Sequence, residues 1–327
     1  VVLGALLHLL IQLPKLLRIK GYRYRAYLGL KDKAILQVFR LMGPRVLGVA
    51  VVQINFIVNT IIALGQAEGS VSAITLAFTL MLMPQMAIAQ SAAIASLPTF
   101  SAQVATKQMD AMRRSLASTL RAVLLLAIPA TVGLILLRRP LIEVLYERGE
   151  FTARSTDLVA WALLWYTAGL VGHSLVEILS RAFYAHQDTR TPVIVGALAM
   201  GLNIAFSFLF SNIFSRIGWM PHGGLALANS LATGLESIAL IMLMQKRLHG
   251  IDGAHIWKGV GVAVLGSGLM AAVILGWQSL VGGGSSVLGL LGGLGLGLGV
   301  YVGLMWLLKM PEMLGMVKMV ISRIQKR

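Results

Sequence analysis

The stretch LRAVLLLAIPATVGLILL, residues Leu120–Leu137, decides the fold class. Apart from Arg121 near its start it carries no charge, and its length approaches the roughly 20 apolar residues that a helix needs to cross a bilayer. Pro129 lies in the middle of the stretch, where a proline removes a backbone hydrogen bond and kinks the helix. Membrane helices tolerate such a kink where a neighbour or a wet cavity satisfies the freed carbonyl. The stretch therefore predicts a transmembrane helix that packs against other helices.

The composition of the whole chain agrees with this prediction. The 327 residues are 57% hydrophobic and 12% charged, with a mean hydropathy of +0.82, whereas an ordinary soluble domain has about 25% charged residues. A soluble protein this apolar would expose large patches and aggregate. The composition therefore excludes a water-soluble enzyme and a disordered tail, and the lack of cysteine excludes disulfides and thiolate metal sites.

Eight further apolar stretches predict an all-α, polytopic membrane protein with about nine transmembrane helices. The chain starts at Val1 inside an apolar run, so we expect an N-terminal part to be missing. Turn residues and charges separate several of the stretches, at Gly65–Gly69, Arg138–Pro140, Asp188–Arg190 and Gly282–Gly284. The expected spans are residues 1–17, 44–64, 71–97, 120–137, 158–180, 191–214, 223–244, 257–280 and 287–308.

The distribution of positive charge predicts the orientation in the membrane. The 28 Lys and Arg against 12 Asp and Glu give a net charge of +16, which could indicate nucleic-acid binding if the cations gathered on a solvated domain. They lie instead in alternate loops, which is the pattern of cytoplasmic loops in membrane proteins. We therefore expect no nucleic-acid partner, a cytoplasmic C-terminus and attraction to anionic membrane lipids. The five cations in the opposite loops are Arg138, Arg139, Arg148, Arg154 and Arg216.

Amide side chains on the second and third spans are the candidates for a substrate cavity. Gln53, Asn55 and Asn59 lie on one span, with the two asparagines on a shared face, and Gln85 and Gln90 follow Pro84 on the next. Unpartnered amides are costly in hydrocarbon, so they must face protein or water. Either they join helices through hydrogen bonds, each of which stabilises the helix pair by about 0.6 kcal/mol, or they line a hydrophilic pathway. The two interpretations are even for Gln53, Asn55 and Asn59, and packing is slightly favoured beside Pro84.

Three ionisable residues inside or beside spans are candidates for coupling transport to an energy source. Glu177 precedes Arg181 by four residues, the order that favours a helical ion pair at the interface. Glu236 lies deeper in its span and has no cation within one helical turn. An ionisable group there is a functional hypothesis by default, although a neutral glutamic acid bonded to a neighbouring helix is an equal alternative.

Catalytic and cofactor motifs are missing from the sequence. The six histidines are scattered without the spacing of metal ligands, and no nucleotide-binding glycine loop is present. The sequence therefore predicts no enzyme activity, no cofactor and no firm metal site. The last span carries glycines at every fourth position, a face that lets another helix or a lipid chain approach closely, and helix packing is favoured.

Several short strings, in this order and spacing, resemble the MurJ (MviN) family of lipid II flippases, within the multidrug/oligosaccharidyl-lipid/polysaccharide exporter superfamily. The resemblance covers essentially the whole chain, and the stretch from Phe183 to Pro192 is quite specific. The strings are Leu41–Pro44 with Gln53–Asn55, Leu97–Ser101, Arg148–Thr152, Ser180–Ala185, Gln187–Pro192 and Gly224–Ala228.

The resemblance implies fourteen membrane helices, in two MATE-like lobes of six around a central cavity plus a final pair. It also implies export of lipid II, the undecaprenyl-linked peptidoglycan precursor, across the bacterial inner membrane by alternating access, with cell-wall synthesis proteins as candidate partners. The implied parts are the last helix of a truncated first lobe (1–17), a basic cytoplasmic linker (18–43), a six-helix second lobe (44–246), two additional helices (257–308) and a basic cytoplasmic tail (309–327).

Two implied binding features are weak in this chain. Phe78 and Thr79 stand where the family often carries an aspartate and an arginine, so this helix lacks the phosphate contact that the arginine implies. Some relatives hold a monovalent cation between the seventh, eleventh and twelfth helices. The matching polar candidates here, all neutral, are Asn59, Asn203, Ser207 and Asn229.

Three other functions remain as alternatives to lipid II export. A relative could move another polyprenyl-linked oligosaccharide or a small cationic compound. A membrane-embedded enzyme acting on polyprenyl phosphates would need clustered acidic or basic residues and perhaps Mg²⁺, and the cytoplasmic loops hold at most one acidic residue each. A scaffold for cell-wall synthesis that transports nothing is the third class.

Overall fold

A computed structural model describes residues 33–281 and 287–308, together with residues 6–7, 10 and 13–14. The chain divides into two compact units, Val1–Arg45 and Val46–Arg327. The expected first span, most of the basic linker, the Gly282–Gly284 turn and the C-terminal tail lie largely or wholly outside the described residues. Nearly all of the described residues belong to the second unit.

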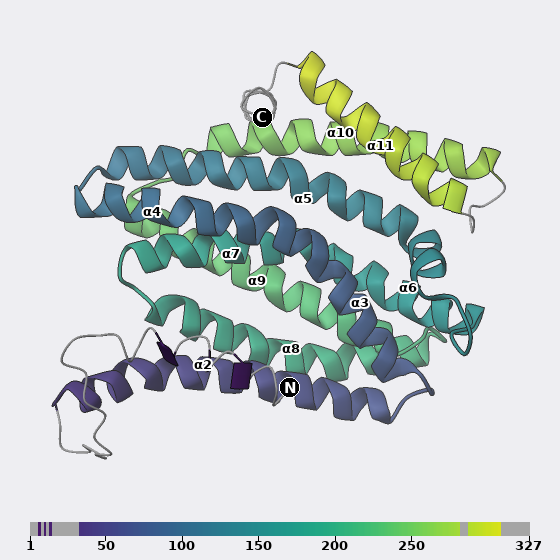
Figure 1. Ribbon diagram of the computed structural model, residues 1–327, viewed down its shortest axis with the longest axis horizontal. Helices are drawn as coiled ribbons and strands as arrows, with labels where there is room; N and C mark the ends of the chain where they lie inside the picture. The colour runs from purple at the N-terminus through teal and green to yellow at the C-terminus, as the bar shows by residue number, and fades with distance from the viewer. Residues whose placement is uncertain (1–5, 8–9, 11–12, 15–32, 282–286, 309–327) are drawn as a thin grey trace. The chain divides into compact units, whose positions relative to one another are not determined.

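The described chain is helical throughout, with no strand among the described residues, which confirms the all-α class (Figure 1). Six helices are long and apolar enough to cross a membrane, or seven if the bent pair α6 and α7 forms one span. Part of α2, Ala50–Leu64, is a shorter apolar helix. The elements are α2 (Lys33–Leu64), α3 (Ser70–Gln85), the π-helix η1 (Met86–Gln90), α4 (Ser91–Ala105), α5 (Met109–Tyr146), α6 (Ala153–Ala168), α7 (Leu170–Ala185), α8 (Arg190–Arg216), α9 (His222–Leu248), α10 (Gly253–Leu280) and α11 (Val287–Leu307).

The break predicted at Arg138–Pro140 is wrong, because α5 runs through it to Tyr146. A proline cannot donate to the carbonyl four residues earlier, so Pro140 frees the carbonyl of Leu136. Gln278 of α10 donates its side-chain amide to that oxygen at 3.2 Å. Pro129 frees the carbonyl of Leu125 in the same way, and the hydroxyl of Tyr301 on α11 donates to it at 2.5 Å. Each carbonyl that a proline of α5 leaves without a backbone donor thus accepts a hydrogen bond from a side chain of α10 or α11.

The span predicted at 158–180 is also wrong as a single helix. It consists of α6 and α7, bent by 45° at Gly169. The hydroxyl of Ser230 on α9 donates at 2.6 Å to the carbonyl of Trp165, which the bend leaves without its helical partner. A Cβ at Gly169 would lie 2.8 Å from the backbone of Ser230. The bend therefore requires a glycine, since α9 crosses directly against it.

The predicted kink at Pro84 takes the form of a π-helix. The helix runs without interruption from Ser70 to Ala105, longer than the expected 71–97, and η1 begins two residues after the proline. Such π turns hold one extra residue and often mark functional positions in helices. Pro84 thereby separates α3 from α4 without ending the span.

The alternate turns gather at two ends of the second unit. At the first end, Arg113 of α5 donates to the carbonyl of Leu248 at 2.5 Å, and Arg247 pairs with Asp188 at 2.8 Å. These contacts join the turns before α5, α8 and α10. We call this the basic end, because nine of the second unit's described cations lie there: Lys107, Arg113, Arg114, Arg121, Arg181, Arg190, Lys246, Arg247 and Lys258.

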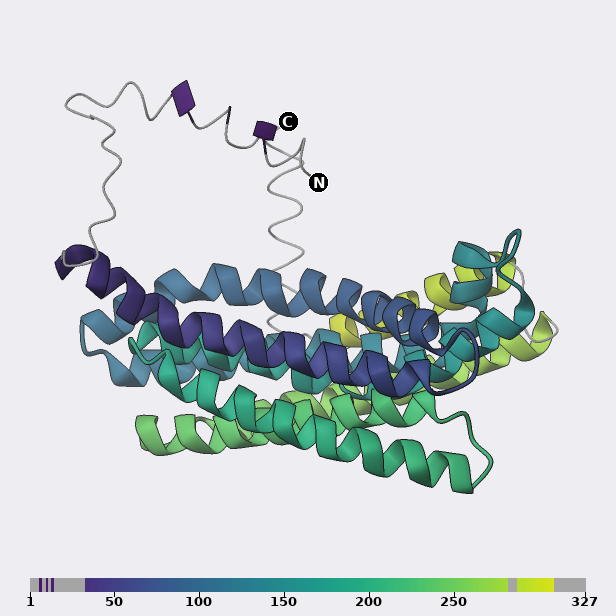
Figure 2. The same ribbon diagram turned by 90° about the horizontal axis from the view of Figure 1, so that it is seen from below.

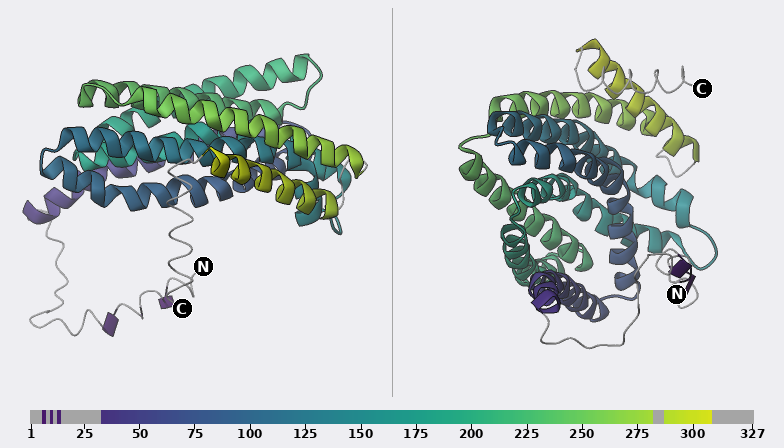
Figure 3. Two further views of the ribbon diagram at one scale, coloured as in Figure 1. Left: turned by 90° about the horizontal axis from the view of Figure 1, so that it is seen from above. Right: turned by 60° about the vertical axis from the view of Figure 1, so that its left-hand side comes forward.

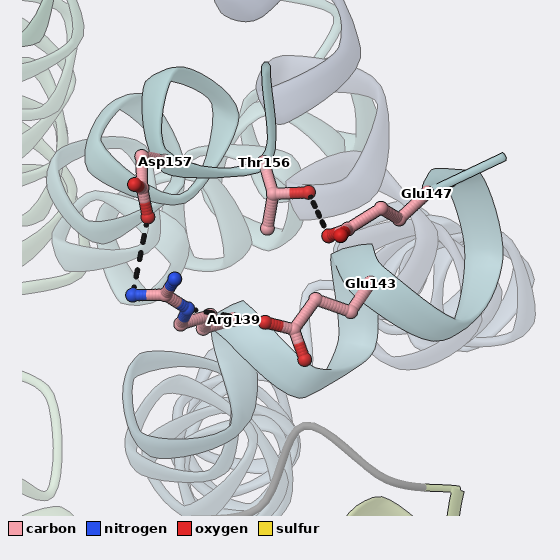
Figure 4. Close-up of polar contacts among 5 residues, drawn as sticks. All are labelled: Arg139, Glu143, Glu147, Thr156 and Asp157. Atoms are coloured by element: carbon pink, nitrogen blue, oxygen red, sulfur yellow. Dashed lines mark hydrogen bonds and ion pairs between the residues drawn. The ribbon is translucent and has the colours of Figure 1, made fainter. Parts of the chain in front are cut away.

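The other end of the unit, which we call the opposite end, holds the turns before α3, α6 and α9. Gln66 donates to Ser211 at 2.9 Å and Trp161 donates to the carbonyl of Met220 at 3.1 Å, joining these turns. An ionic network also ties the end of α5 to the start of α6 (Figure 4). Its contacts are Arg139 to Glu143 at 3.1 Å, Arg139 to Asp157 at 3.2 Å and Thr156 to Glu147 at 2.7 Å.

Three clusters of buried apolar side chains hold the helices together. One joins α3 and α6 around Met81 and Leu163, and one lies toward the basic end around Phe100 and Phe183. The third joins α5, α10 and α11 around Met270 and Ile274. In Figures 1 and 3, α10 and α11 accordingly lie beside α5, on the other side of the unit from α8.

Candidate functional site

Two of the predicted cavity residues, Asn55 and Asn59, join α2 to α8, and the two helices run side by side in Figure 2. Asn59 donates its amide to Asn55 at 3.1 Å and to Asn203 at 3.4 Å, and Asn55 donates to the carbonyl of Met200 at 3.3 Å. Ser207 donates to Asn59 at 2.8 Å and to Asn203 at 3.1 Å. We call Asn55, Asn59, Asn203 and Ser207 the amide cluster. Its contacts favour the helix-joining interpretation.

The amide cluster does not fit a resident monovalent cation. The side-chain oxygens of its three asparagines already accept hydrogen bonds from neighbouring side chains. The buried Nδ2 of Asn203 has no hydrogen-bond partner among the described residues. The hydrogens of this amide carry partial positive charge and would repel a cation. Within the described residues, no group of three or more His, Asp or Glu could hold a metal ion. We therefore derive no step through a bound cation.

A small cavity of about 40 Å³ lies between α2, α3, α6 and α9, lined in part by Asn55, Asn59 and Asn229. Asn229 does not join the amide cluster through any hydrogen bond in the described chain. It accepts instead from Nε2 of His173 on α7 at 3.0 Å, and Thr233 lies 3.4 Å from the same nitrogen. Sequence spacing gave no sign of this His173–Asn229 pair, because 56 residues separate its members.

Phe78, at the position where the family often carries an aspartate, fills the space beside this cavity. Its ring lies 5.8 Å from Phe56, 5.2 Å from Tyr166 and 6.2 Å from the imidazole of His173, in tilted or edge-on arrangements. Such arrangements stabilise aromatic pairs beyond their buried area. Thr79 is exposed and donates its hydroxyl to the carbonyl of Thr75 at 2.8 Å. Aromatic packing therefore occupies this part of α3.

The three glutamines predicted to line the cavity are separated by the fold. Gln53 and Gln90 are exposed, on α2 and at the end of η1, while Gln85 is buried at the end of α3. The exposed pair lies on helices that show large apolar side chains to the outside, such as Ile54 and Met86. Gln53 and Gln90 thus remain candidates for a polar face of this lobe.

The predicted coupling residues fall at two different places. Glu177 and Arg181 form the expected ion pair, with 2.7 Å between Oε1 and Nη2, and each is about one-quarter exposed. Glu236 lies against α8, where a Cβ at Gly196 would come within 3.2 Å of its carboxylate. The described residues give Glu236 no ion pair and no hydrogen bond. It is therefore an acidic side chain in a membrane helix without a protein counter-charge in the described chain.

The turn Gln187–Pro192, which belongs to the specific stretch Phe183–Pro192 of the resemblance, joins α8 to α9 at the basic end. The Asp188 carboxylate accepts from the backbone and the hydroxyl of Thr191, at 3.0 and 2.7 Å. Burial by itself would raise the pKa of Asp188, but the bonds from Thr191 and Arg247 outweigh it and hold that pKa below its ordinary value. The guanidinium of Arg247 also lies 5.4 Å from the centre of the Phe183 ring.

A larger apolar cavity of about 440 Å³ opens between η1, α5, α10 and α11. Its walls include Pro84, Pro129 and Gly297, and Gly297 allows close approach because a Cβ there would lie 2.9 Å from Ile274. The glycine face predicted on the last span is thus used in two ways, since Gly293 and Gly297 pack against the neighbouring helices and Gly297 also borders the cavity. The size and lining suit an acyl or polyprenyl chain.

Comparison with known proteins supports the family suggested by the sequence. Residues 1–291 match the family model described as lipid II flippase MurJ. The chain is 31% identical over 284 residues to a probable lipid II flippase MurJ of Vibrio cholerae, covering 85% of this chain and 51% of the relative. It is 30% identical over 287 residues to the lipid II flippase MurJ of Burkholderia cenocepacia, covering 86% and 54%. The chain thus spans about half the length of these curated relatives.

Solved structures agree with the sequence comparison. A lipid II flippase MurJ in an inward closed conformation superposes with a TM-score of 0.71 at 26% identity, over 88% of this chain and 56% of that one. An outward-facing MATE family transporter of the MOP superfamily gives a TM-score of 0.56 at 16% identity, over 82% and 64%, which shows a shared fold alone. This multi-pass membrane protein therefore belongs to the MurJ family of lipid II flippases.

Proposed function

We propose that this chain forms the second lobe and the final helix pair of a transporter that moves lipid II from the cytoplasmic to the outer leaflet. The match of residues 1–291 to the lipid II flippase model carries this proposal. Moving a lipid-linked headgroup from one leaflet to the other breaks no covalent bond, so the proposed activity is transport.

The same proposal assigns an orientation in the bacterial inner membrane. The basic end faces the cytoplasm, as the preference of Lys and Arg for cytoplasmic loops requires. The opposite end holds five described cations and five described acidic side chains, so its charges balance in number. Arg139 forms ion pairs there with Glu143 and Asp157. By continuity the C-terminal tail is also cytoplasmic.

The lobe would contribute a largely uncharged wall to the transport pathway. The exposed Gln53 and Gln90 would supply polar contacts, and Asn55 and Asn59 hold α2 in place against α8. Glu236 is the strongest candidate for coupling, because it is the acidic group deepest within a membrane helix of the described chain. Glu177 and Arg181 supply an ion pair that can break and re-form as helices move. The apolar cavity beside α11 would take the polyprenyl chain.

A leaflet-specific assay tests the proposal. In cells depleted of the protein encoded by the complete gene, lipid II should accumulate in the cytoplasmic leaflet, and re-expression should restore export. Residues 1–327 alone should neither rescue the cells nor move lipid II in vesicles, because one lobe supplies half of an alternating-access site. Co-expression with a first lobe should restore activity if the two halves assemble.

The alternative functions predict different results in the same cells. An exporter of another polyprenyl-linked glycan, or of small cationic compounds, would leave lipid II distribution unchanged on depletion. A scaffold would change the location of cell-wall synthesis proteins while lipid II still reached the outer leaflet. Robust transport by residues 1–327 alone would contradict the two-lobe model itself.

A further inference from the structure

A polar groove of about 580 Å³ lies between α4 and α5, toward the basic end and away from the amide cluster. Its lining combines the Arg114 guanidinium with the hydroxyls of Thr99, Ser115 and Ser118, and with small apolar side chains such as Ala92 and Ala95. The volume lies within the range of ordinary small-molecule sites, about 300–1,000 Å³. The proposed transport pathway does not use this groove.

The polar groups of the groove are available as donors. Arg114 is exposed and makes no ion pair or hydrogen bond with the described residues, whereas its neighbour Arg113 is paired with Asp110 at 3.1 Å. Ser115 accepts a hydrogen bond from Gln103 at 2.8 Å, which leaves its own proton free to donate. Thr99 and Ser118 likewise have no partner in the described chain. No carboxylate is among the lining residues, so the groove complements an anion.

The position of the groove selects a lipid-linked anion over a free one. Arg114 lies five residues from the start of α5, which is roughly 7.5 Å along the helix. The proposed orientation would place it near the lipid phosphates of the cytoplasmic leaflet. Ala92 and Ala95 extend the groove along α4 toward the membrane interior. A guanidinium fork suits phosphate oxygens geometrically as well as electrostatically.

We propose that this groove binds the diphosphate of the polyprenyl-linked substrate before it enters the transport pathway, with Arg114 as its principal contact. The inference rests on the proposed function and adds a site to it. It also supplies the lobe with a phosphate contact, since Thr79 and its neighbours in α3 offer none. Binding at the groove is reversible and involves no covalent step.

Binding assays on the protein encoded by the complete gene test this site. Native mass spectrometry in detergent would compare undecaprenyl diphosphate, neutral undecaprenol and inorganic diphosphate as probes. Arg114→Gln should weaken binding of undecaprenyl diphosphate on the order of tenfold, the effect of losing one exposed charge-assisted hydrogen bond, and leave undecaprenol unchanged. Arg114→Lys should retain part of the affinity. Ser118→Leu, which fills the groove at constant charge, should weaken binding as well.

Lys107→Gln is the matched control, because it removes the same charge from the same end without touching the groove. Unchanged binding in both Arg114→Gln and Ser118→Leu would overturn the proposal, as would equal weakening in Lys107→Gln. Inorganic diphosphate binding as tightly as the lipid would show a free-anion site instead. If the wild-type protein binds undecaprenyl diphosphate at the groove but does not move lipid II, that result would contradict the proposed function and leave the binding site standing.

Discussion

The hydroxyl of Tyr301 should stabilise the fold only because Pro129 is present. Tyr301 on α11 is 4% exposed and donates to the carbonyl of Leu125, which Pro129 cannot reach with a backbone N–H. Tyr301→Phe removes that donor and keeps the ring that packs against Gly266. In a Pro129→Ala background, the backbone N–H of residue 129 can bond to the same carbonyl. The tyrosine should then be dispensable.

The expected energies follow from hydrogen bonds inside membranes. Bonds between membrane helices are worth about 0.6 kcal/mol on average and up to about 1.7 kcal/mol, and a carbonyl left bare in hydrocarbon costs more than a merely weakened bond. Tyr301→Phe alone should therefore lower the free energy of unfolding by about 1.5 kcal/mol. In the Pro129→Ala background the loss should fall below about 0.5 kcal/mol, giving a coupling of about 1 kcal/mol.

Reversible unfolding in mixed micelles, followed by tryptophan fluorescence, would measure all four members of this double-mutant cycle. The pair Pro140 and Gln278 provides an independent repeat, with Gln278→Leu and Pro140→Ala. Additive effects within about 0.3 kcal/mol in both cycles would refute the reasoning, because the side-chain donors would then not be compensating for the prolines.

Four further predictions rest on other contacts. Gly224→Ala should destabilise the protein by about 1–3 kcal/mol, because its Cβ would lie 2.6 Å from the α8 backbone, and Gly234→Ala, with open space around it, is the control in a thermal unfolding assay. The pKa of Asp188 in the folded protein lies below its ordinary value, so the carboxylate stabilises the fold above about pH 4 and this stabilisation is lost as the pH falls through the folded pKa. Asp188→Asn should therefore reduce the difference in melting temperature between pH 6 and pH 3. An unchanged difference would contradict this. Single cysteines in Gly65–Gly69 should label from outside intact cells and those in Lys107–Met112 should not, and equal labelling would contradict the proposed orientation. Asn59→Leu, like Asn55→Leu, should impair lipid II export more than protein level, whereas normal export in both variants would leave only the packing interpretation.

Most of the helices could be predicted because hydrocarbon imposes a simple length and polarity requirement. Thr191 to Phe214 and Val287 to Leu308 were expected as spans, and α8 and α11 coincide with them to within a few residues. The same reasoning failed at Arg138–Pro140. Charged residues beside a proline usually indicate the end of a helix, but here Gln278 donates to the carbonyl of Leu136 that Pro140 leaves without a backbone donor.

Features that depend on contacts distant in sequence could not be predicted. The bend at Gly169 lies within an apolar run and is produced by Ser230 of another helix. The pairing of Asn59 with Asn203 and Ser207 was suggested only by the family resemblance, and the His173–Asn229 bond was not suggested at all. Local periodicity identifies which face of a helix is polar, but the partner of that face is set by the packing of the whole lobe.

The π-helix at Met86–Gln90 affects how the sequences of relatives align with this chain. The wide π turn absorbs one additional residue, so α4 presents the same face that a regular helix with one residue fewer would present. Deleting a single residue from η1 should therefore restore a regular helical turn and leave Phe100 in its buried position. In an alignment with a relative that lacks the π turn, equivalent positions therefore shift by one residue beyond Gln90, and a gap there reflects geometry rather than divergence.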